Sequence, residues 1–357
     1  MTKPVKFLIC PANSGGCAYY RAWDPFKKLA EKYPDEVEMR FDLNPLGLDL
    51  STMQWQEDFD FENMHWADVI FTQNISNYGG QYTARIVGKG KEFGKKICFD
   101  TDDLLTDLYK GHRLEQVYKD RGLSDITKFI YSHADLITVT QSKFAERIHP
   151  YCGGALAVIK NAIDYELPCW NHPKIPPQNK RLTRIGWAGG IHHEEDVKEF
   201  AGTPQMVNQR VGRENVHWGF YGKPPVNPET GPDWQHDVWA NYQKILLSGF
   251  RGSRNWDIYH ALPAADYGVI FANVDIAIAP LQMNDFNDSK SDIKVAECGR
   301  YSLPLIASDV GCYSDTIKNG QTGYLIKPGA PKSDWVRVLT KVIKDKKHRI
   351  EMGRIFT

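Results

Sequence analysis

The chain has 357 residues, of which 42% are hydrophobic and 25% are charged. This composition excludes intrinsic disorder, collagen and coiled coil as descriptions of the whole chain. The length predicts two domains, each large enough to bury a core of its own. Basic and acidic side chains balance at 44 each, which excludes a strongly basic nucleic-acid binder, so any polyanionic partner must meet a local patch.

The beginning of the chain and its cysteines indicate a cytoplasmic protein. The apolar run 5–10 stops at Pro11 and is too short for the core of a signal peptide. No run of about 18 apolar residues occurs, so we expect no membrane-spanning segment. The seven cysteines are scattered and include no C-x-x-C pair, so we expect reduced thiols.

Short apolar runs alternate with amphipathic stretches in the first half of the chain. Runs of this length are typical of parallel strands covered on both faces, and the stretches between them are typical of the covering helices. The pattern predicts a doubly wound, Rossmann-like α/β domain over residues 1–166. Its predicted strands are 5–10, 37–43, 67–73, 96–100 and 136–141.

The same pattern restarts after a segment rich in proline, asparagine and lysine. This segment, residues 167–181, is a predicted linker because repeated proline disfavours regular structure. A second Rossmann-like α/β domain is predicted over 182–332. Its predicted strands are 183–189, 216–222, 274–281, 303–309 and 323–328.

Two further segments complete the predicted elements. Residues 223–260 are rich in proline and tryptophan, and we expect loops with one helix around 239–247. Residues 333–357 predict one amphipathic helix, because apolar side chains recur there at helical spacing. These side chains are Trp335, Val338, Leu339, Val342 and Ile343.

Two glycines, Gly15 and Gly16, stand between the first predicted strand and the helix that follows it. Open parallel sheets bind ligands at the carboxyl ends of their strands, and glycine there lets a phosphate approach backbone N–H groups. The pair fits neither the Walker A nor the G-x-G-x-x-G pattern. A tight loop without a ligand is the commoner explanation of such a pair.

Residues 274–326 hold the most informative pattern. A predicted strand is followed by a loop, a helix that bears Glu297, the turn GRYSLP, a second strand and the turn NGQTGYLI. This order resembles the donor-binding segment of retaining glycosyltransferases with the GT-B fold, particularly those of family four. Further stretches match the family in the right order: SGGCAYYR (14–21), SHADLITVTQSKFAERI (132–148), VIKNAID (158–164) and RIGWAGGIHHEED (184–196).

The resemblance implies a fold, a pair of substrates and a location in the cell. It implies two Rossmann-like domains that face a cleft, with a nucleotide sugar such as a UDP-sugar bound by the second domain and the acceptor by the first. The stretches PANSGGCAYYRAWDP and FNDSKSDIK are similar to a branch often met in large bacteriophages, which implies the host cytoplasm. The implied acceptor is a glycan or a hydroxymethylated DNA base.

Lys290 and Lys294 are spaced i and i+4, so we expect them on one face at the start of a helix. Sugar transfer loads negative charge onto the leaving diphosphate. The two lysines, the helix dipole and the Gly189–Gly190 loop would stabilise this charge without a metal. Solvated surface lysines are the alternative. Glu297 matches the family's glutamate that binds the nucleotide ribose.

Two positions depart from the family pattern. The family commonly has a second glutamate eight positions before Glu297, where this chain has Ser289, and this leaves the donor sugar open. His192 and His193 stand where the family usually has Arg and Lys. A protonated His192 could hydrogen-bond a phosphate, although solvated histidines are more common. Adjacent side chains point apart, so we expect no metal site at this pair.

Asp100 and Asp102 lie at the end of the predicted strand 96–100. Two carboxylates at this spacing are the pattern by which GT-A glycosyltransferases hold a divalent metal. We prefer a role at the acceptor side, in which they orient or deprotonate a hydroxyl, because the second half of the chain accounts for the donor without a metal. Aspartates that cap a helix are the structural alternative.

A basic group lies in the first predicted domain. It could guide a polyanion such as DNA, although a solvated helix face is the commoner explanation. The group consists of Arg85, Lys89, Lys91, Lys95 and Lys96.

The resemblance therefore implies a retaining glycosyltransferase, and the lysines and glycines predict that it needs neither a metal nor a cofactor beyond its nucleotide-sugar co-substrate. One alternative is a non-catalytic module that binds a sugar nucleotide or a glycan, which Ser289 favours. A second is a metal-dependent GT-A enzyme that uses Asp100 and Asp102.

Overall fold

The structure is a computed structural model that describes residues 3–13, 15–49, 51–74, 80–177, 179 and 181–355. Residues 178 and 180 of the predicted linker, and 356 and 357 of the predicted last helix, therefore lie outside the described residues. The chain forms two compact units. The first comprises Met1–Lys110, Leu114–Ala162 and Ser289–Ser291, and the second Gly111–Arg113, Ile163–Asp288 and Asp292–Thr357.

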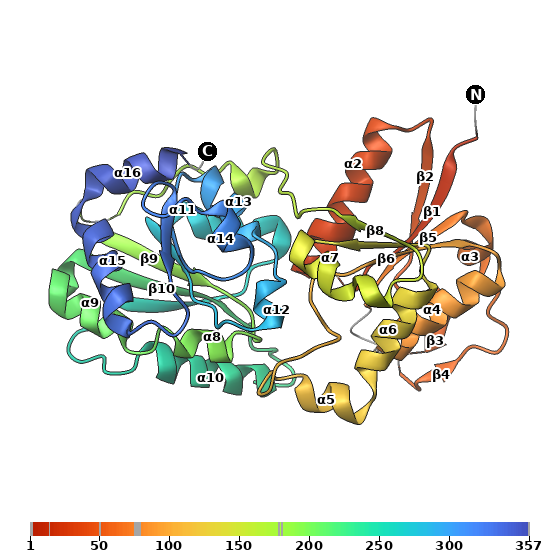
Figure 1. Cartoon of the computed structure of the whole chain (residues 1–357), viewed down its shortest axis with the longest axis horizontal. Helices are drawn as coiled ribbons and strands as arrows, with labels where there is room; N and C mark the ends of the chain where they lie inside the picture. The colour runs from red at the N-terminus through yellow and green to blue at the C-terminus, as the bar shows by residue number, and fades with distance from the viewer. Residues whose placement is uncertain are drawn as a thin grey trace. The chain divides into compact units, whose positions relative to one another are not determined.

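The first unit is built on a six-stranded sheet in the order β2-β1-β5-β6-β7-β8 (Figure 1). Neighbouring strands all pair in parallel, which confirms a doubly wound α/β arrangement. The strands are β1 (Val5–Cys10), β2 (Val37–Phe41), β5 (Val69–Gln73), β6 (Lys96–Asp100), β7 (Leu136–Val139) and β8 (Ala155–Val158).

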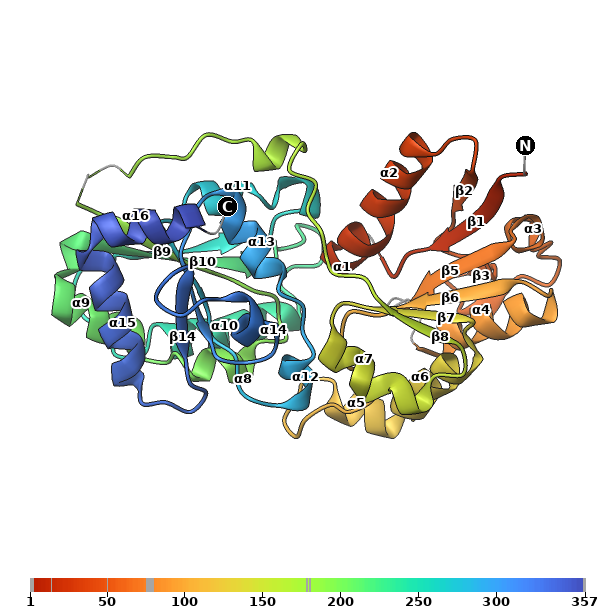
Figure 2. The ribbon, with the colours of Figure 1, turned by 45° about the horizontal axis from the view of Figure 1, so that its top comes forward.

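Helices cover both faces of this sheet. Figure 2 shows α2 on one face and α4 with α6 on the other. Apolar side chains such as Ile86 and Val87 of α4 are fully buried. The helices are α1 (Gly16–Ala18), a π-helix η1 (Tyr19–Trp23), α2 (Asp24–Lys32), α3 (Glu62–Trp66), α4 (Gly80–Glu92), α5 (Glu115–Asp120), α6 (Leu123–His133), α7 (Ser142–Ile148) and η2 (His149–Tyr151), with a small hairpin of β3 (Leu48–Asp49) and β4 (Gln54–Trp55).

The second unit repeats the plan with the order β11-β10-β9-β12-β13-β14, again all parallel. The sequence does not predict β11, because this edge strand alternates poorly and its side chains are only partly buried. The strands are β9 (Thr183–Ala188), β10 (Val216–Lys223), β11 (Trp256–His260), β12 (Ile276–Ala279), β13 (Leu305–Ser308) and β14 (Gly323–Ile326).

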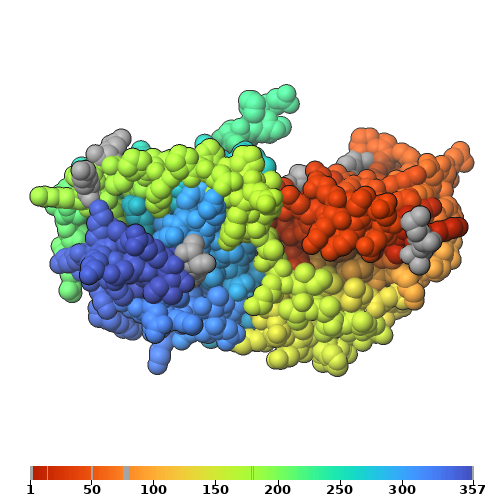
Figure 3. All heavy atoms as spheres, turned by 90° about the horizontal axis from the view of Figure 1, so that it is seen from above, coloured from red at the N-terminus to blue at the C-terminus, as the bar shows by residue number. Residues whose placement is uncertain are grey.

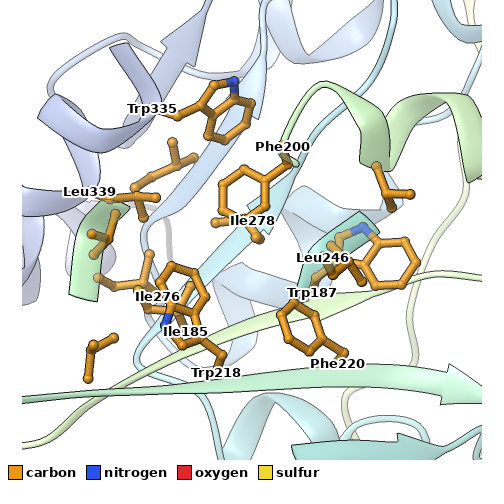
Figure 4. Packing of buried hydrophobic residues seen from close by; sticks show 14 of the residues in the cluster. Ile185, Trp187, Phe200, Trp218, Phe220, Leu246, Ile276, Ile278, Trp335 and Leu339 are labelled. Atoms are coloured by element: carbon orange, nitrogen blue, oxygen red, sulfur yellow. The ribbon is translucent and has the colours of Figure 1, made fainter. Parts of the chain in front are cut away.

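Two apolar clusters fill the two faces of the second sheet. One packs α9, α10 and α15 against the sheet through large side chains such as Trp218, Phe220 and Trp335 (Figure 4). The other involves α11, α13 and α14. The helices are α8 (Glu194–Lys198), α9 (Thr203–Val211), α10 (Trp234–Leu246), α11 (Val269–Ala272), α12 (Asp285–Asp288), α13 (Ile293–Arg300), α14 (Cys312–Thr316), α15 (Lys332–Lys344) and α16 (Lys346–Ile355), with 3-10 turns η3 (Pro168–Trp170), η4 (Arg213–Asn215) and η5 (Ala264–Asp266).

The predicted single helix over 333–357 is wrong, because the structure has two helices, α15 and α16, that meet at Asp345. Asp345 leaves the helical backbone conformation, with φ −97° and ψ 79°. Its Oδ1 accepts a hydrogen bond from the backbone N–H of His348 at 2.9 Å. Asp345 therefore ends α15 and caps the start of α16.

The predicted linker is packed on the second unit. Trp170 is 1% exposed, its carbonyl oxygen accepts from Arg300 Nε at 2.9 Å, and the Ile175 N–H donates to the Ala272 carbonyl oxygen at 3.0 Å. Figure 3 shows this extended yellow-green stretch lying along the surface of the second unit. Among the residues that the structure describes, no helix combines the length and apolar character needed to cross a membrane.

Candidate functional site

Most of the donor-site residues predicted in the second domain follow the carboxyl ends of β9 and β12. Gly189 and Gly190 follow β9. The Gly189 N–H donates to the Tyr221 carbonyl oxygen at 3.1 Å, and a Cβ at Gly189 would lie 2.5 Å from the Trp187 ring. A Cβ at Gly190 would meet nothing within 4 Å. Gly189 is thus needed for packing, whereas Gly190 leaves space beside the backbone for a ligand.

Asp196 fixes the loops around this edge, a role that the sequence does not reveal. It is 1% exposed and its Oδ2 lies 2.8 Å from His193 Nδ1. Its Oδ1 accepts from the backbone N–H of Gln282 at 2.9 Å and from Asn287 Nδ2 at 2.8 Å. The loop after β12 is therefore tied to the turn after β9, where His192 lies half-buried.

Lys294 and Glu297 form a buried ion pair on α13. Lys294 Nζ lies 2.7 Å from Glu297 Oε2 and donates to the Tyr267 hydroxyl at 2.8 Å. Burial alone would lower the pKa of Lys294, but Glu297 and Tyr267 raise it well above its ordinary value. Burial raises the pKa of Glu297, against the opposing effect of Lys294. An ammonium group has three N–H donors, so these two contacts do not exhaust it.

The prediction that Lys290 and Lys294 share one helix face is wrong. α13 begins at Ile293, so Lys290 precedes it. The preceding stretch is held by its aspartates instead: Asp288 Oδ1 accepts from the Gly311 N–H at 3.1 Å and Asp292 Oδ2 from Thr316 Oγ1 at 3.0 Å.

Ser289 and Lys290 belong to the short stretch that groups with the first unit. Ser289 is fully buried. Lys290 Nζ lies 3.3 Å from Asp103 Oδ1, so an acid already partners this lysine. The contacts bring Lys290 to the aspartates that follow β6.

In the first unit, the glycine pair lies at the carboxyl end of β1. The Gly15 N–H donates to Asn13 Oδ1 at 2.6 Å. Gly16 is the first residue of α1, and a Cβ there would meet nothing within 4 Å. Packing alone does not require glycine at position 16.

Asp100 is held in a closed network. Its side chain is 2% exposed and pairs with Arg21, whose side chain is 3% exposed. Arg21 Nε lies 3.1 Å from both carboxylate oxygens, and Gln73 Nε2 and Thr138 Oγ1 donate to them at 2.9 and 2.6 Å. Because several donors already engage this buried carboxylate, its contacts favour a positioning role over proton transfer to a substrate.

Arg21 extends the network across the unit. Its Nη1 donates to Asn161 Oδ1 at 3.2 Å and to the carbonyl oxygen of Ile159. One guanidinium thus ties the helical segment after β1 to the end of β6 and to the chain after β8.

Asp102 is more accessible than Asp100, being half-buried. Burial and the neighbouring Asp103 raise its pKa to about 6. Its charge in turn raises the pKa of the Cys17 thiol well above the ordinary value, and the two side chains hydrogen-bond. The glycine loop and Asp102 therefore meet at the carboxyl edge of the first sheet. A carboxyl group that titrates near neutral pH is suited to proton transfer.

The basic group on α4 and β6 is largely met by acids of its own unit. Lys91 and Lys96 pair with Asp135 at 2.6 and 3.2 Å, and Lys89 pairs with Glu92 at 2.9 Å. These two carboxylates offset two of the five positive charges, so the group keeps a net positive charge. The remaining two, which contact a backbone carbonyl oxygen and an indole ring, are Lys95 and Arg85.

Within the described ranges, no group of three or more histidine, cysteine, aspartate or glutamate side chains is arranged to hold a metal ion. The pairing of Asp100 with Arg21 removes one of the two carboxylates on which the GT-A alternative depends.

Comparison with solved structures decides the fold. The sucrose-phosphate synthase of Thermosynechococcus elongatus matches with a TM-score of 0.66 and 12% identity, over 99% of this chain and 93% of that chain. HepE of Anabaena, in complex with UDP and glucose, matches at 0.58 and 14%, over 99% and 94%. The lipopolysaccharide outer core galactosyltransferase WaaB matches at 0.52 and 16%, over 99% and 94%. The chain has the GT-B fold.

One family model also matches. Residues 253–355 fit the family described as Glycosyl transferases group 1. This span includes α13 with its Lys294–Glu297 pair. No curated protein sequence matches the chain.

Replacing Asp100 should test its positioning role. Asp100→Asn leaves Arg21 buried without its counter-charge, so we expect the free energy of unfolding to fall by about 3–5 kcal/mol. Asp102→Asn, the matched control two residues on, should change it by no more than about 1 kcal/mol. Urea unfolding followed by circular dichroism measures both. Unchanged stability of Asp100→Asn together with lost activity would instead make Asp100 a catalytic residue.

Proposed function

We propose that this protein is a retaining glycosyltransferase that moves a sugar from a nucleotide donor, such as a UDP-sugar, to an acceptor hydroxyl. The observation that carries the proposal is the buried Lys294–Glu297 pair on α13, inside the span that fits the Glycosyl transferases group 1 family. The ammonium supplies positive charge toward a leaving diphosphate, and the carboxylate accepts hydrogen bonds from ribose hydroxyls. A similarly folded protein, HepE, has been solved with UDP-glucose.

On the acceptor side, we assign Asp102 the role of orienting or deprotonating the attacking hydroxyl. It is half-buried and its pKa is about 6, so it is mostly ionised at neutral pH. Asp100 would hold Arg21 and the end of β6 in place behind it. The acceptor is a glycan or a hydroxymethylated DNA base; three of the five cations of the basic group pair with acids, but Asp135 and Glu92 offset only two of the five charges.

The alternative is a module of the same fold that binds a sugar nucleotide without turnover. Its support is Ser289, which stands where the family commonly has a glutamate and which is fully buried. The two functions differ in one observable. An enzyme releases or transfers sugar, whereas a binding module only saturates with nucleotide.

A panel of nucleotide sugars tests the proposal directly. Calorimetry should show binding of a nucleoside diphosphate, and incubation without acceptor should show slow release of sugar from one donor. We expect both to persist in excess EDTA, because lysine and backbone groups rather than a metal would meet the diphosphate. Binding without any release or transfer would favour the module. Loss of binding and release in EDTA, restored by Mg²⁺ or Mn²⁺, would overturn the metal-free donor site.

Removing a positive charge should slow transfer. Lys294→Ala is expected to lower kcat/KM by about 10²-fold, the usual effect of losing a group that stabilises charge in the transition state. Lys290→Ala tests in the same way the lysine that lies outside α13. Lys344→Ala, an exposed lysine of α15, is the control and should keep full activity. Circular dichroism must confirm that each variant is folded; normal turnover in folded Lys294→Ala would remove this residue from the site.

The rate should depend on the ionisation of Asp102. A base must be deprotonated, and the pKa of Asp102 is about 6, so kcat/KM should be constant above this pH and fall about tenfold per pH unit below it. In Asp102→Asn the rate should be low throughout and this acidic limb should vanish, while nucleotide affinity is retained. An unaltered acidic limb in the variant would assign the titration to another group.

A further inference from the structure

A cavity of about 450 Å³ lies in the second unit, at the opposite edge of the sheet from the donor residues. Two residues that line it, Asp275 and Pro304, come directly before β12 and β13. Because all strands of this sheet are parallel, their amino ends share one edge. The cavity is therefore separate from the Gly189–Gly190 loop, which follows the carboxyl end of β9.

The wall of this cavity carries an excess of positive charge. Asp275 is the one acidic residue among the described residues that line it. Asp275 is itself paired with Arg184, whose Nε and Nη2 each lie 3.0 Å from its carboxylate oxygens. The cations of the wall are Lys174, Arg300, Lys346, Arg349 and Arg354.

Neutral oxygens position several of these cations without cancelling their charge. Arg349 is 8% exposed and its Nη1 donates to Thr183 Oγ1 at 3.3 Å and to backbone carbonyl oxygens. Arg300 Nε donates to the Trp170 carbonyl oxygen at 2.9 Å. Lys174 is exposed as a residue, but its amino group donates to the carbonyl oxygens of Phe271 and Val274.

The start of α16 adds to the positive potential. The carboxylate of Asp345 caps this helix, and three basic residues, Lys346, Lys347 and Arg349, outnumber it in a first turn that has no acidic residue of its own. Cations at a helix N-terminus oppose the helix dipole and are unfavourable there. A bound anion would relieve this repulsion and accept hydrogen bonds from the guanidinium groups.

The cavity also has room and apolar surface for more than an ion. Its volume is within the range of small-molecule sites. Tyr301, Leu303 and Ile350 contribute apolar surface beside the cations. α16 lies directly on the Tyr301–Pro304 turn, because a Cβ at Gly353 would overlap the Ser302 carbonyl oxygen.

We propose that this basic cavity binds a phosphate monoester carried on a small organic body, such as a sugar phosphate. Arg300, Lys346 and Arg349 hold the phosphate, and the apolar wall holds the body. The site is separate from the donor site and does not depend on the proposed function. α13 connects the two, since it carries Glu297 and ends at Arg300.

Calorimetric titration of the full chain with glucose 6-phosphate and glycerol 3-phosphate tests the site. Glucose and inorganic phosphate, which each lack one part of the probe, should bind at least tenfold more weakly. Lys346→Glu should weaken binding of the phosphate ester by tenfold or more, since it replaces a cation of the wall by an anion. Lys347→Glu is the matched control, because the neighbouring exposed lysine does not line the cavity.

Four outcomes would overturn the proposal. The first is that wild-type protein binds neither ester. The second is equal loss in Lys347→Glu, which would show a general charge effect. The third is loss in Lys294→Ala but not in Lys346→Glu, which would move the phosphate to the donor site. The fourth is equal affinity for inorganic phosphate, which would make the bare anion the occupant. Retained affinity in Lys347→Glu with loss in folded Lys346→Glu supports it.

Discussion

The common direction of the strands is the constraint on which the sites of this protein depend. Each unit has six strands that all run the same way, so each sheet has one carboxyl edge and one amino edge. In the second unit the carboxyl edge collects Gly189 and Asp196, and hydrogen bonds join Asp196 to Gln282 and Asn287 of the loop after β12, 86 and 91 positions later in the sequence. The amino edge collects lysines and arginines. The parallel topology thus places the predicted donor residues and the basic cavity at opposite edges of the same sheet.

The ion pairs Arg21–Asp100 and Lys294–Glu297 differ in how far they are closed to solvent. In Arg21–Asp100 both side chains are at most 3% exposed, and glutamine, threonine and asparagine side chains complete the network. In Lys294–Glu297 the lysine side chain is 21% exposed. Burying charge is costly unless the partners are fully hydrogen-bonded. The first pair meets that condition within the protein, while the second leaves part of the lysine side chain accessible.

The sequence indicates the strands of both sheets well where they are buried on both faces, because their apolar runs are continuous. The sequence does not predict β8 and β11, because each is an edge strand with no fully buried side chain. The sequence does not predict the break at Asp345, because the break depends on one side-chain contact, the cap that Asp345 forms with the His348 N–H.

The site residues likewise divide into those that the sequence pattern reveals and those that only the structure reveals. The segment with Glu297 is evident from its local pattern of strand, helix and turns. The role of Asp100 is not, since its partner Arg21 lies 79 positions away and the Asp-x-Asp spacing by itself resembles a metal motif. Asp196 leaves only a weak signal, an acidic residue in the first turn of a short helix. Contacts between distant segments decide these roles, and local patterns do not contain them.

The tryptophans of the second unit give the protein an optical reporter of its own. Trp187, Trp218, Trp239 and Trp335 share one apolar cluster, so their emission should be that of indoles shielded from water. Of these four tryptophans, Trp187 lies next to the Gly189–Gly190 loop. It is 3% exposed, and its ring lies against Gly189. A nucleotide that settles beside Gly190 would alter the surroundings of this indole. Intrinsic fluorescence can therefore follow occupancy of the loop without any label.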